Sequence, residues 1–362
     1  MLKPRQSVTG IPAYHPPLAG REGLRLDFNE NTVGCSPRVL EKLRSISSEQ
    51  LARYPEREPV EARVADFLGI SPSELLLTNG VDEAIHLLCQ TYLDSGDEAL
   101  IVVPTYSMYR IYASAAGASV VSVPYADGFR FDADAVQSRI TERTRFVAIA
   151  NPNNPTGTVA SLGDLLKIAH SAPQAAVLID EAYFEFYGKT MLEARREASN
   201  IFVARTFSKV YGLAGLRVGV LIGHAEQMKA VRLVSSPYNV NAVALACLPD
   251  AVSDQSYIDQ YVKEALECRS RLEGALQAGG VHFWPSQANF VLMRVGSSAD
   301  EAVRFVEAMR RRGILVRDRS SDHGCLGCVR ITVGPREHAD RLLHALRETL
   351  EELGLVQGAL RR

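Results

Sequence analysis

The amino-acid sequence predicts an α/β fold with a large domain built on a mainly parallel seven-stranded sheet, followed by a smaller α+β domain. From residue 73 onward, short apolar runs alternate with longer stretches of helical periodicity, which is the pattern of successive βαβ units in a sheet covered on both faces. After Pro249 the order changes to one long helix, followed by strands mixed with helices. The chain has 362 residues, which is enough for two domains.

The strands expected in the large domain are short runs of apolar residues. They cover residues 75–79, 99–103, 119–123, 146–150, 176–180, 201–205 and 217–223. Helices are expected between them, where apolar residues recur every three or four positions. These helices cover residues 82–92, 106–116, 162–170 and 225–234.

The second region begins with a long helical pattern and continues with alternating elements. We expect helices at 255–277, 299–311 and 336–353, and strands at 290–295, 314–317 and 329–333. The first 40 residues are rich in Pro and Gly without a regular period, so we expect an arm that wraps over another surface. The predicted division is an arm at 1–40, a large domain at 41–250 and a small domain at 251–362.

Composition narrows the class of protein. The net charge of -2 and the isoelectric point of about 6.5 argue against a nucleic-acid partner. The longest apolar run is well short of the ~20 residues that span a bilayer, so no membrane segment is expected. Six dispersed cysteines, and a start without the pattern of a secretory leader, predict a reducing cytoplasm.

Two of the cysteines form a C-x-x-C motif at Cys325 and Cys328. A zinc site would need a second pair or nearby histidines. The alternative is that both thiols pack at the start of the strand that follows. We favour the packed thiols and expect no metal.

Residues suited to ligand binding or catalysis lie at or just past the ends of five predicted strands. They are Gly80, Pro104, Asn151, Asp180 and Thr206. In open α/β sheets, ligands bind at the carboxyl ends of the strands. The five positions are therefore expected to meet in one crevice.

Lys209 and Asp180 carry the central chemical hypothesis. Lys209 lies in Thr206-Phe207-Ser208-Lys209, where its amine can form an imine with an aldehyde. Asp180 ends an apolar strand, which is a costly position for a carboxylate unless a cation pairs with it. A pyridinium N–H is such a cation. The two residues together therefore predict pyridoxal phosphate as the cofactor. The alternatives are a surface lysine and a helix-capping aspartate.

Other residues suit the rest of that cofactor. Tyr183 and Asn154 can hydrogen-bond its phenolate oxygen. Gly80 opens a helix whose first N–H groups form an anion site. Thr206, Ser208 and Arg217 could also bind the phosphate. Tyr106 could stack over the pyridine ring, and the alternative is that it is an ordinary core or edge tyrosine.

These residues resemble the fold-type I pyridoxal-phosphate enzymes and, among them, the histidinol-phosphate aminotransferase family. The similarity extends from about Tyr14 to Leu353. The motifs that carry it are Asn29-Glu30-Asn31, Arg53-Tyr54-Pro55, Asn79-Gly80-Val81-Asp82-Glu83, Pro104-Thr105-Tyr106, Asn153-Asn154-Pro155-Thr156-Gly157, Asp180-Glu181-Ala182-Tyr183, Thr206-Phe207-Ser208-Lys209, Gly212 to Gly219 and Val329 to Gly334.

The resemblance implies roles for individual residues. Lys209 would bind the cofactor aldehyde, Asp180 its pyridinium, and Asn154 and Tyr183 its hydroxyl. The phosphate would be held by Val81, Asp82, Thr206, Ser208 and Arg217, with Tyr106 over the ring. The family's active unit is a homodimer with shared sites, in which Tyr54 would reach the neighbour's cofactor phosphate and Tyr14 the neighbour's substrate.

The resemblance also implies a substrate pair. Arg317 and Arg330 would bind the anionic groups of an amino donor and a 2-oxo acid acceptor. The expected reaction is transamination of L-histidinol phosphate with 2-oxoglutarate by a ping-pong route. An aromatic amino acid aminotransferase and a threonine-phosphate decarboxylase are the alternatives with the same fold. A cofactor-sensing regulator would need an added basic DNA-binding region, which does not fit the short, proline-rich start of this chain.

Two segments depart from the usual family pattern. Thr32-Val33-Gly34 stands where a proline is common, and Ser320 to Gly324 differs before Cys325. The second segment is expected to border the substrate entrance.

Overall fold

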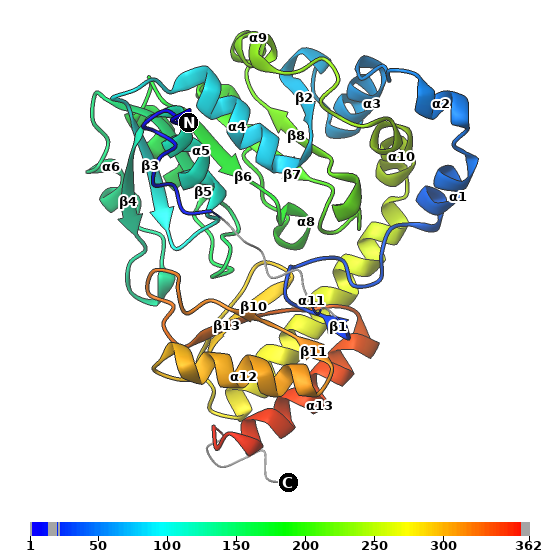
Figure 1. The fold of residues 1–362 in the computed structure, drawn as a ribbon, viewed down its shortest axis with the longest axis vertical. Helices are drawn as coiled ribbons and strands as arrows, with labels where there is room; N and C mark the ends of the chain where they lie inside the picture. Colours follow the sequence, from blue (N-terminus) through cyan, green and yellow to red (C-terminus); the bar gives the residue numbers. More distant parts are fainter. Residues whose placement is uncertain (1, 14–19, 21, 356–362) are drawn as a thin grey trace.

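The structure is a computed structural model that describes residues 2–13, 20 and 22–355. It contains two lobes (Figure 1). The upper lobe in that view is built around the large sheet, and the lower lobe contains the C-terminal helices α12 and α13. The long helix α11, Gln255–Ala278, runs from the upper lobe into the lower one.

The large sheet has seven strands in the order β2-β8-β7-β6-β5-β3-β4. Neighbours from β7 to β4 are parallel, whereas β8 is antiparallel to both β2 and β7. The sheet is therefore mainly parallel, as predicted. Its strands are β2 (Leu75–Thr78), β3 (Glu98–Val103), β4 (Ser119–Pro124), β5 (Thr144–Ala150), β6 (Ala176–Asp180), β7 (Ile201–Thr206) and β8 (Gly219–Ile222).

Helices cover both faces of this sheet. The strands are apolar on both sides, so successive residues alternate between two cores: Leu76 packs in one and Leu77 in the other. One core is closed by α4 (Gly80–Tyr92), α5 (Met108–Ala116) and α9 (Ala225–Val234). The other is closed by α3 (Glu58–Leu68), α6 (Ala133–Gln137), α7 (Leu162–Ser171), α8 (Phe184–Tyr187) and α10 (Ala242–Ser253).

Six of the helices were not among those predicted from the sequence. They are α1 (Pro37–Ser45), α2 (Ser48–Ala52), α3, α6, α8 and α10. Pro249 lies inside α10, where the sequence indicated a break, because the packing of α10 against α1 and α3 outweighs the local preference. The predicted domain boundary at residue 250 falls within this helix.

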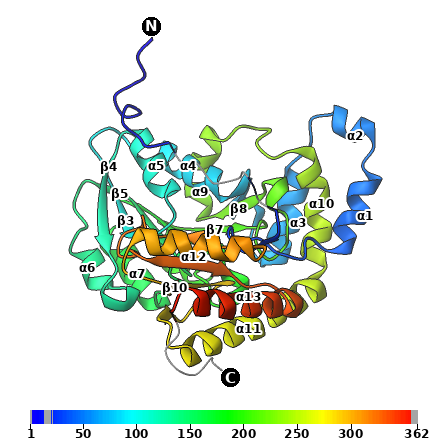
Figure 2. The ribbon, with the colours of Figure 1, turned by 60° about the horizontal axis from the view of Figure 1, so that its bottom comes forward.

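The small lobe contains an antiparallel sheet in the order β12-β13-β10-β9. Its strands are β9 (Phe283–Trp284), β10 (Phe290–Arg294), β12 (Arg317–Asp318) and β13 (Cys328–Thr332). The helices α11, α12 (Ala299–Arg311) and α13 (Arg336–Glu352) pack on it (Figure 2). The predicted strand at 314–317 is two short strands, β11 (Ile314–Leu315) and β12.

The segment predicted as an arm contributes to the small lobe. Strand β1, Leu24–Arg25, pairs in parallel with β11, and the buried side chains of Leu24 and Leu26 join the small-lobe core. Short 3-10 turns occur at Pro72–Glu74, Asp127–Phe129, Ala194–Glu197 and Ala214–Leu216. None of the helices in the described ranges has the length and apolar character needed to cross a membrane.

Candidate active site

Strands β2, β3, β5, β6 and β7 end at one edge of the large sheet, and the antiparallel β8 begins there. Gly219, the first residue of β8, pairs with both Thr78 and Thr206. A Cβ on Gly219 would lie 2.9 Å from the carbonyl carbon of Gly80 and 3.0 Å from the nitrogen of Val81. The glycine therefore lets the end of β8 approach the start of α4 closely.

The start of α4 forms a charged corner. Gly80 has a φ of +73°, and a Cβ on it would lie 2.6 Å from Nη2 of Arg217. Arg217 donates from Nη2 to Oδ2 of Asp82 at 3.0 Å, and Tyr106 donates to Oδ1 of Asp82 at 2.7 Å. A guanidinium thus stands over the N-terminus of a helix, where an anion is favoured.

Ser208 lies in the loop after β7, two residues past Thr206, which pairs with Gly219 beside the start of α4. Its backbone N–H donates to Oγ1 of Thr206 at 3.1 Å. Its own Oγ is buried and has no hydrogen-bond partner among the described residues. A buried, unpaired hydroxyl costs free energy unless a ligand pairs with it. Together with Arg217 and the first turn of α4, Ser208 fits the phosphate of the predicted cofactor.

Asp180, the last residue of β6, lies on the floor of the site and is only 5% exposed. Its Oδ1 accepts from the N–H of Ala182 at 3.0 Å, and its Oδ2 accepts from the hydroxyl of Tyr109 at 2.5 Å. Burial raises the pKa of Asp180 to about 6, while these two hydrogen bonds oppose the shift. A cation at this position would favour the ionised form, so Asp180 fits a pyridinium N–H.

Tyr183 and Asn154 approach from neighbouring loops. The hydroxyl oxygen of Tyr183 accepts from Nδ2 of Asn29 at 2.8 Å, which leaves the hydroxyl proton to donate. Oδ1 of Asn154 accepts from Arg330, which directs its amide NH₂ elsewhere. Both residues can therefore donate to a phenolate oxygen.

Lys209 lies where the two lobes meet. Its Nζ donates to the carbonyl oxygen of Phe28 at 2.9 Å. Burial and the nearby guanidinium of Arg330 lower the pKa of Lys209 to about 8. A larger fraction of the amine is therefore neutral near pH 7, and the neutral amine is the form that attacks an aldehyde.

Two predicted arginines lie side by side in the small lobe. Arg317 on β12 pairs in register with Arg330 on β13. Arg330 is buried and donates to the carbonyl oxygen of Asp27 at 2.6 Å. Arg317 lies over the ring of Phe28 at 5.4 Å. The pair therefore places two guanidinium groups on the small-lobe side of Lys209.

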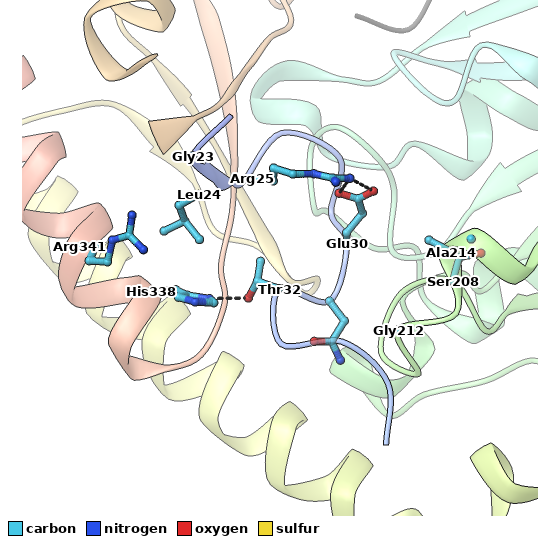
Figure 3. Close-up of a pocket in the computed structure, with 12 residues that line it drawn as sticks. Gly23, Leu24, Arg25, Glu30, Thr32, Ser208, Gly212, Ala214, His338 and Arg341 are labelled. Carbon is cyan, nitrogen blue, oxygen red and sulfur yellow. Dashed lines mark hydrogen bonds and ion pairs between the residues drawn. The ribbon is translucent and has the colours of Figure 1, made fainter. Parts of the chain in front are cut away.

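A cavity of about 470 Å³ adjoins the site (Figure 3). It lies between the N-terminal segment, the loop after Ser208 and the start of α13. Arg25 donates to both carboxylate oxygens of Glu30, at 2.6 and 2.7 Å, along one wall. His338 contacts Oγ1 of Thr32 at 2.9 Å along another.

Most of the predicted residues that the structure describes thus lie at one place. The predicted residues that the structure brings to the sheet edge and the adjoining lobe interface are Gly80, Val81, Asp82, Tyr106, Asn154, Asp180, Tyr183, Thr206, Ser208, Lys209, Arg217, Arg317 and Arg330. Tyr54, which was predicted to reach the cofactor of a neighbouring subunit, lies on the surface, 78% exposed, with its ring stacked on Tyr238 at 4.3 Å. Tyr14 lies outside the described residues.

The sequence interpretation missed three residues at the site. Tyr109 bonds Asp180, Asn29 bonds Tyr183, and Arg319 pairs with Asp322 beside Arg330. Tyr109 could have been found, because it follows Tyr106 by three positions at the start of a helix and so lies on the same face. Asn29 lies in one of the family motifs, but its partner Tyr183 is 154 residues away, so the motif gave it no role. Arg319 gave no local signal that places it beside Arg330.

The C-x-x-C thiols pack in a separate apolar cluster, mostly of small-lobe residues. Cys325 and Cys328 are both free and buried, and they pack with Phe129, Trp284 and Leu292. The described part of the chain contains no group of three or more His, Cys, Asp or Glu arranged to hold a metal ion.

Comparison with known proteins places this arrangement in a family. The family model for aminotransferase class I and II matches residues 21–346. The chain belongs to this family. A histidinol-phosphate aminotransferase from Bacillus cytotoxicus is 35% identical, covering 91% of this chain and 89% of that protein. One from Geobacillus sp. is 34% identical, covering 97% and 99%.

A solved structure agrees with these relatives. The histidinol-phosphate aminotransferase from Sinorhizobium meliloti, in complex with pyridoxal-5'-phosphate, is 25% identical and superposes with a TM-score of 0.87. The match covers 96% of this aminotransferase and 97% of that chain. The fold class and the family resemblance predicted from sequence are thus confirmed.

Proposed function

We propose that this aminotransferase binds pyridoxal phosphate at the edge of the large sheet and transfers the amino group of L-histidinol phosphate to 2-oxoglutarate in a ping-pong cycle. The products would be imidazole-acetol phosphate and glutamate, a step of histidine biosynthesis. The observation that carries the proposal is a desolvated amine, Lys209, which follows the strand next to the one that ends in the buried Asp180 and lies near the guanidinium of Arg330 on the small lobe.

The bound cofactor would supply an aldehyde that condenses with amines and a ring that accepts electrons from the substrate α-carbon. Lys209 would hold the aldehyde carbon between cycles and then move the proton from the α-carbon. Asp180 would keep the ring nitrogen protonated. Ser208 Oγ, Arg217 and the first N–H groups of α4 would fix the phosphate.

The arginine pair supports a dianionic substrate. Histidinol phosphate has a phosphate, whereas 2-oxoglutarate and glutamate have two carboxylates, so one pocket must bind each in turn. Planar guanidinium groups form paired hydrogen bonds with both kinds of anion. Arg330 is held in place by Asp27 and Asn154, so little side-chain entropy is lost when it binds.

We also propose a homodimer in which Tyr54 reaches the cofactor phosphate of the partner. The support is a group of exposed apolar side chains: Tyr54 stacks on Tyr238, and Leu51, three residues before Tyr54, is 56% exposed. Burial of such a patch stabilises association. The free thiols of all six cysteines support the proposed cytoplasmic location.

A comparison of steady-state kinetics with four amino donors tests the proposed substrate. Histidinol phosphate, phenylalanine, tyrosine and O-phosphothreonine would be compared as donors with 2-oxoglutarate, with product analysis to detect decarboxylation. We expect the highest kcat/KM with histidinol phosphate. A preference for an unphosphorylated aromatic donor, or release of CO₂ from phosphothreonine, would overturn the substrate proposal and leave the cofactor proposal standing.

A further inference from the structure

The first turn of α5 contacts two different parts of the candidate cofactor site. Tyr106, just before the helix, donates to Asp82 at the phosphate corner at 2.7 Å. Tyr109, one turn later, donates to Asp180 at 2.5 Å. The two rings meet edge to face, with centroids 5.8 Å apart and planes at 87°. One short segment therefore links the two carboxylates that border the site.

Tyr109 is an unusual residue for a purely structural role. It is fully buried in the core between α5 and the sheet, where a phenylalanine would fill almost the same space. Burial, and then the charge of Asp180, raise the pKa of Tyr109 well above its ordinary value, so its hydroxyl remains a donor. Its hydrogen bond to a buried carboxylate is of the charge-assisted kind, which fixes orientation strongly.

Several groups around Asp180 favour its protonated form, and the hydroxyl of Tyr109 opposes them. Burial disfavours the carboxylate, and the negative charges of Asp82 on α4 and Glu181 beside it act in the same direction. Tyr109 on α5 and the N–H of Ala182 act against them. Tyr183, whose hydroxyl bonds Asn29, is the other titratable group close by. Removing Tyr109 would leave one carboxylate oxygen without its donor.

We propose that Tyr109 is a positioning residue for the cofactor: its hydroxyl fixes the carboxylate of Asp180 so that the remaining oxygen lone pairs are available to the ring N–H. This inference rests on the proposed placement of the cofactor ring at Asp180. Tyr106 does the same for Asp82 and Arg217 at the phosphate corner. The rigid first turn of α5 thus sets the distance between the two anchor points.

The test uses pyridoxamine 5'-phosphate, which binds without forming a bond to Lys209. Its dissociation constant would be measured by calorimetry from pH 5 to 9 for the wild type and for Tyr109→Phe, Tyr112→Phe and Asp180→Asn. Tyr112 is the matched control, because it lies one turn further along α5 with its ring stacked on His86. The ionisations of the probe itself affect all four proteins equally, so differences between their pH profiles come from the protein.

In the wild type, affinity should fall at acid pH as Asp180 takes up a proton, and Asp180→Asn should remove that dependence. Tyr109→Phe should move the dependence upward by about one pH unit and weaken binding at pH 7 by roughly threefold to tenfold. It should also reduce the circular dichroism of the bound probe, which reports a fixed ring orientation. Tyr112→Phe should match the wild type.

A Tyr109→Phe variant with the wild-type pH dependence and dichroism would overturn the inference while leaving the cofactor placement intact. If instead Asp180→Asn bound the probe like the wild type at every pH, the placement itself would be wrong. If Tyr109→Phe did not fold, wild-type protein labelled with 3-fluorotyrosine would decide. One fluorine resonance should then titrate near pH 6, and that titration should be lost in Asp180→Asn; its absence would refute the role of Tyr109.

Discussion

The proposed cofactor half and the proposed substrate half of this site are built in different ways. Asp180, Thr206 and Ser208 lie at the ends of two neighbouring strands, so the pairing of one sheet sets their spacing. Arg330 instead depends on contacts between distant segments, since its partners Asp27 and Asn154 are 303 and 176 residues away. Within this chain, the proposed cofactor contacts at Asp180, Thr206 and Ser208 therefore belong to a single lobe, whereas the proposed substrate contacts depend on how the two lobes meet.

Lys209 belongs to both halves, so its loss should have the largest effect. We expect Lys209→Ala to lower kcat by about 10⁴-fold or more, because both the covalent link and the proton transfer disappear. The variant should also lose the adduct that borohydride reduction fixes. Lys189→Ala, which removes an exposed lysine near Tyr187, serves as the control and should keep both activity and label. A label that remains in the Lys209 variant would contradict the assignment.

A substitution in the substrate half should impair substrate recognition far more than cofactor affinity. Arg330→Gln should lower kcat/KM for the dianionic substrates roughly 10-fold to 100-fold, because a charged hydrogen-bond pair is worth about 1.5–3 kcal/mol. Affinity for pyridoxal phosphate should change little. Arg317→Gln should have a smaller effect, since Arg317 is more exposed than Arg330. Equal losses of cofactor affinity and kcat/KM would show that the two halves are not separable.

Ser208→Ala changes the proposed cofactor half and leaves the substrate half intact. It removes the buried hydroxyl that is unpaired among the described residues, so the free protein should lose little stability. Affinity for pyridoxal phosphate should fall by about fivefold to tenfold, the value of a neutral hydrogen bond of about 1 kcal/mol. KM for the donor at saturating cofactor should stay within about twofold. Unchanged cofactor affinity would exclude Ser208 from the phosphate site.

The smallest effect concerns pH and links the two halves. The pKa of Lys209 is lowered to about 8 by burial first and by Arg330 second, so the neutral amine is present above that pH and is lost as pH falls through it. The rate of cofactor incorporation into the apoprotein should rise with pH around a midpoint near 8. In Arg330→Gln the midpoint should move upward, because one repelling charge is gone. An unshifted midpoint would show that burial alone sets the pKa.

Much of the cofactor half could be predicted from sequence because its signals are local. An aspartate at the end of an apolar run, a glycine between strand and helix, and a lysine shortly after another strand are each visible in a few residues. Parallel pairing then brings strand ends together without further information. Tyr109 was missed although its spacing from Tyr106 was available, because nothing local marks a core tyrosine as a partner of Asp180.

The sequence by itself determined the succession of the seven large-sheet strands along the chain, the residues at the strand ends and the chemistry that they suit, because these depend on periodicity and on neighbours in the chain. Tertiary structure decided that α10 continues through Pro249, that β1 joins the small lobe, that Asn29 bonds Tyr183, and that Arg330 lies beside Lys209. Each of these depends on burial and pairing between segments far apart in the chain, whose energies no local pattern contains.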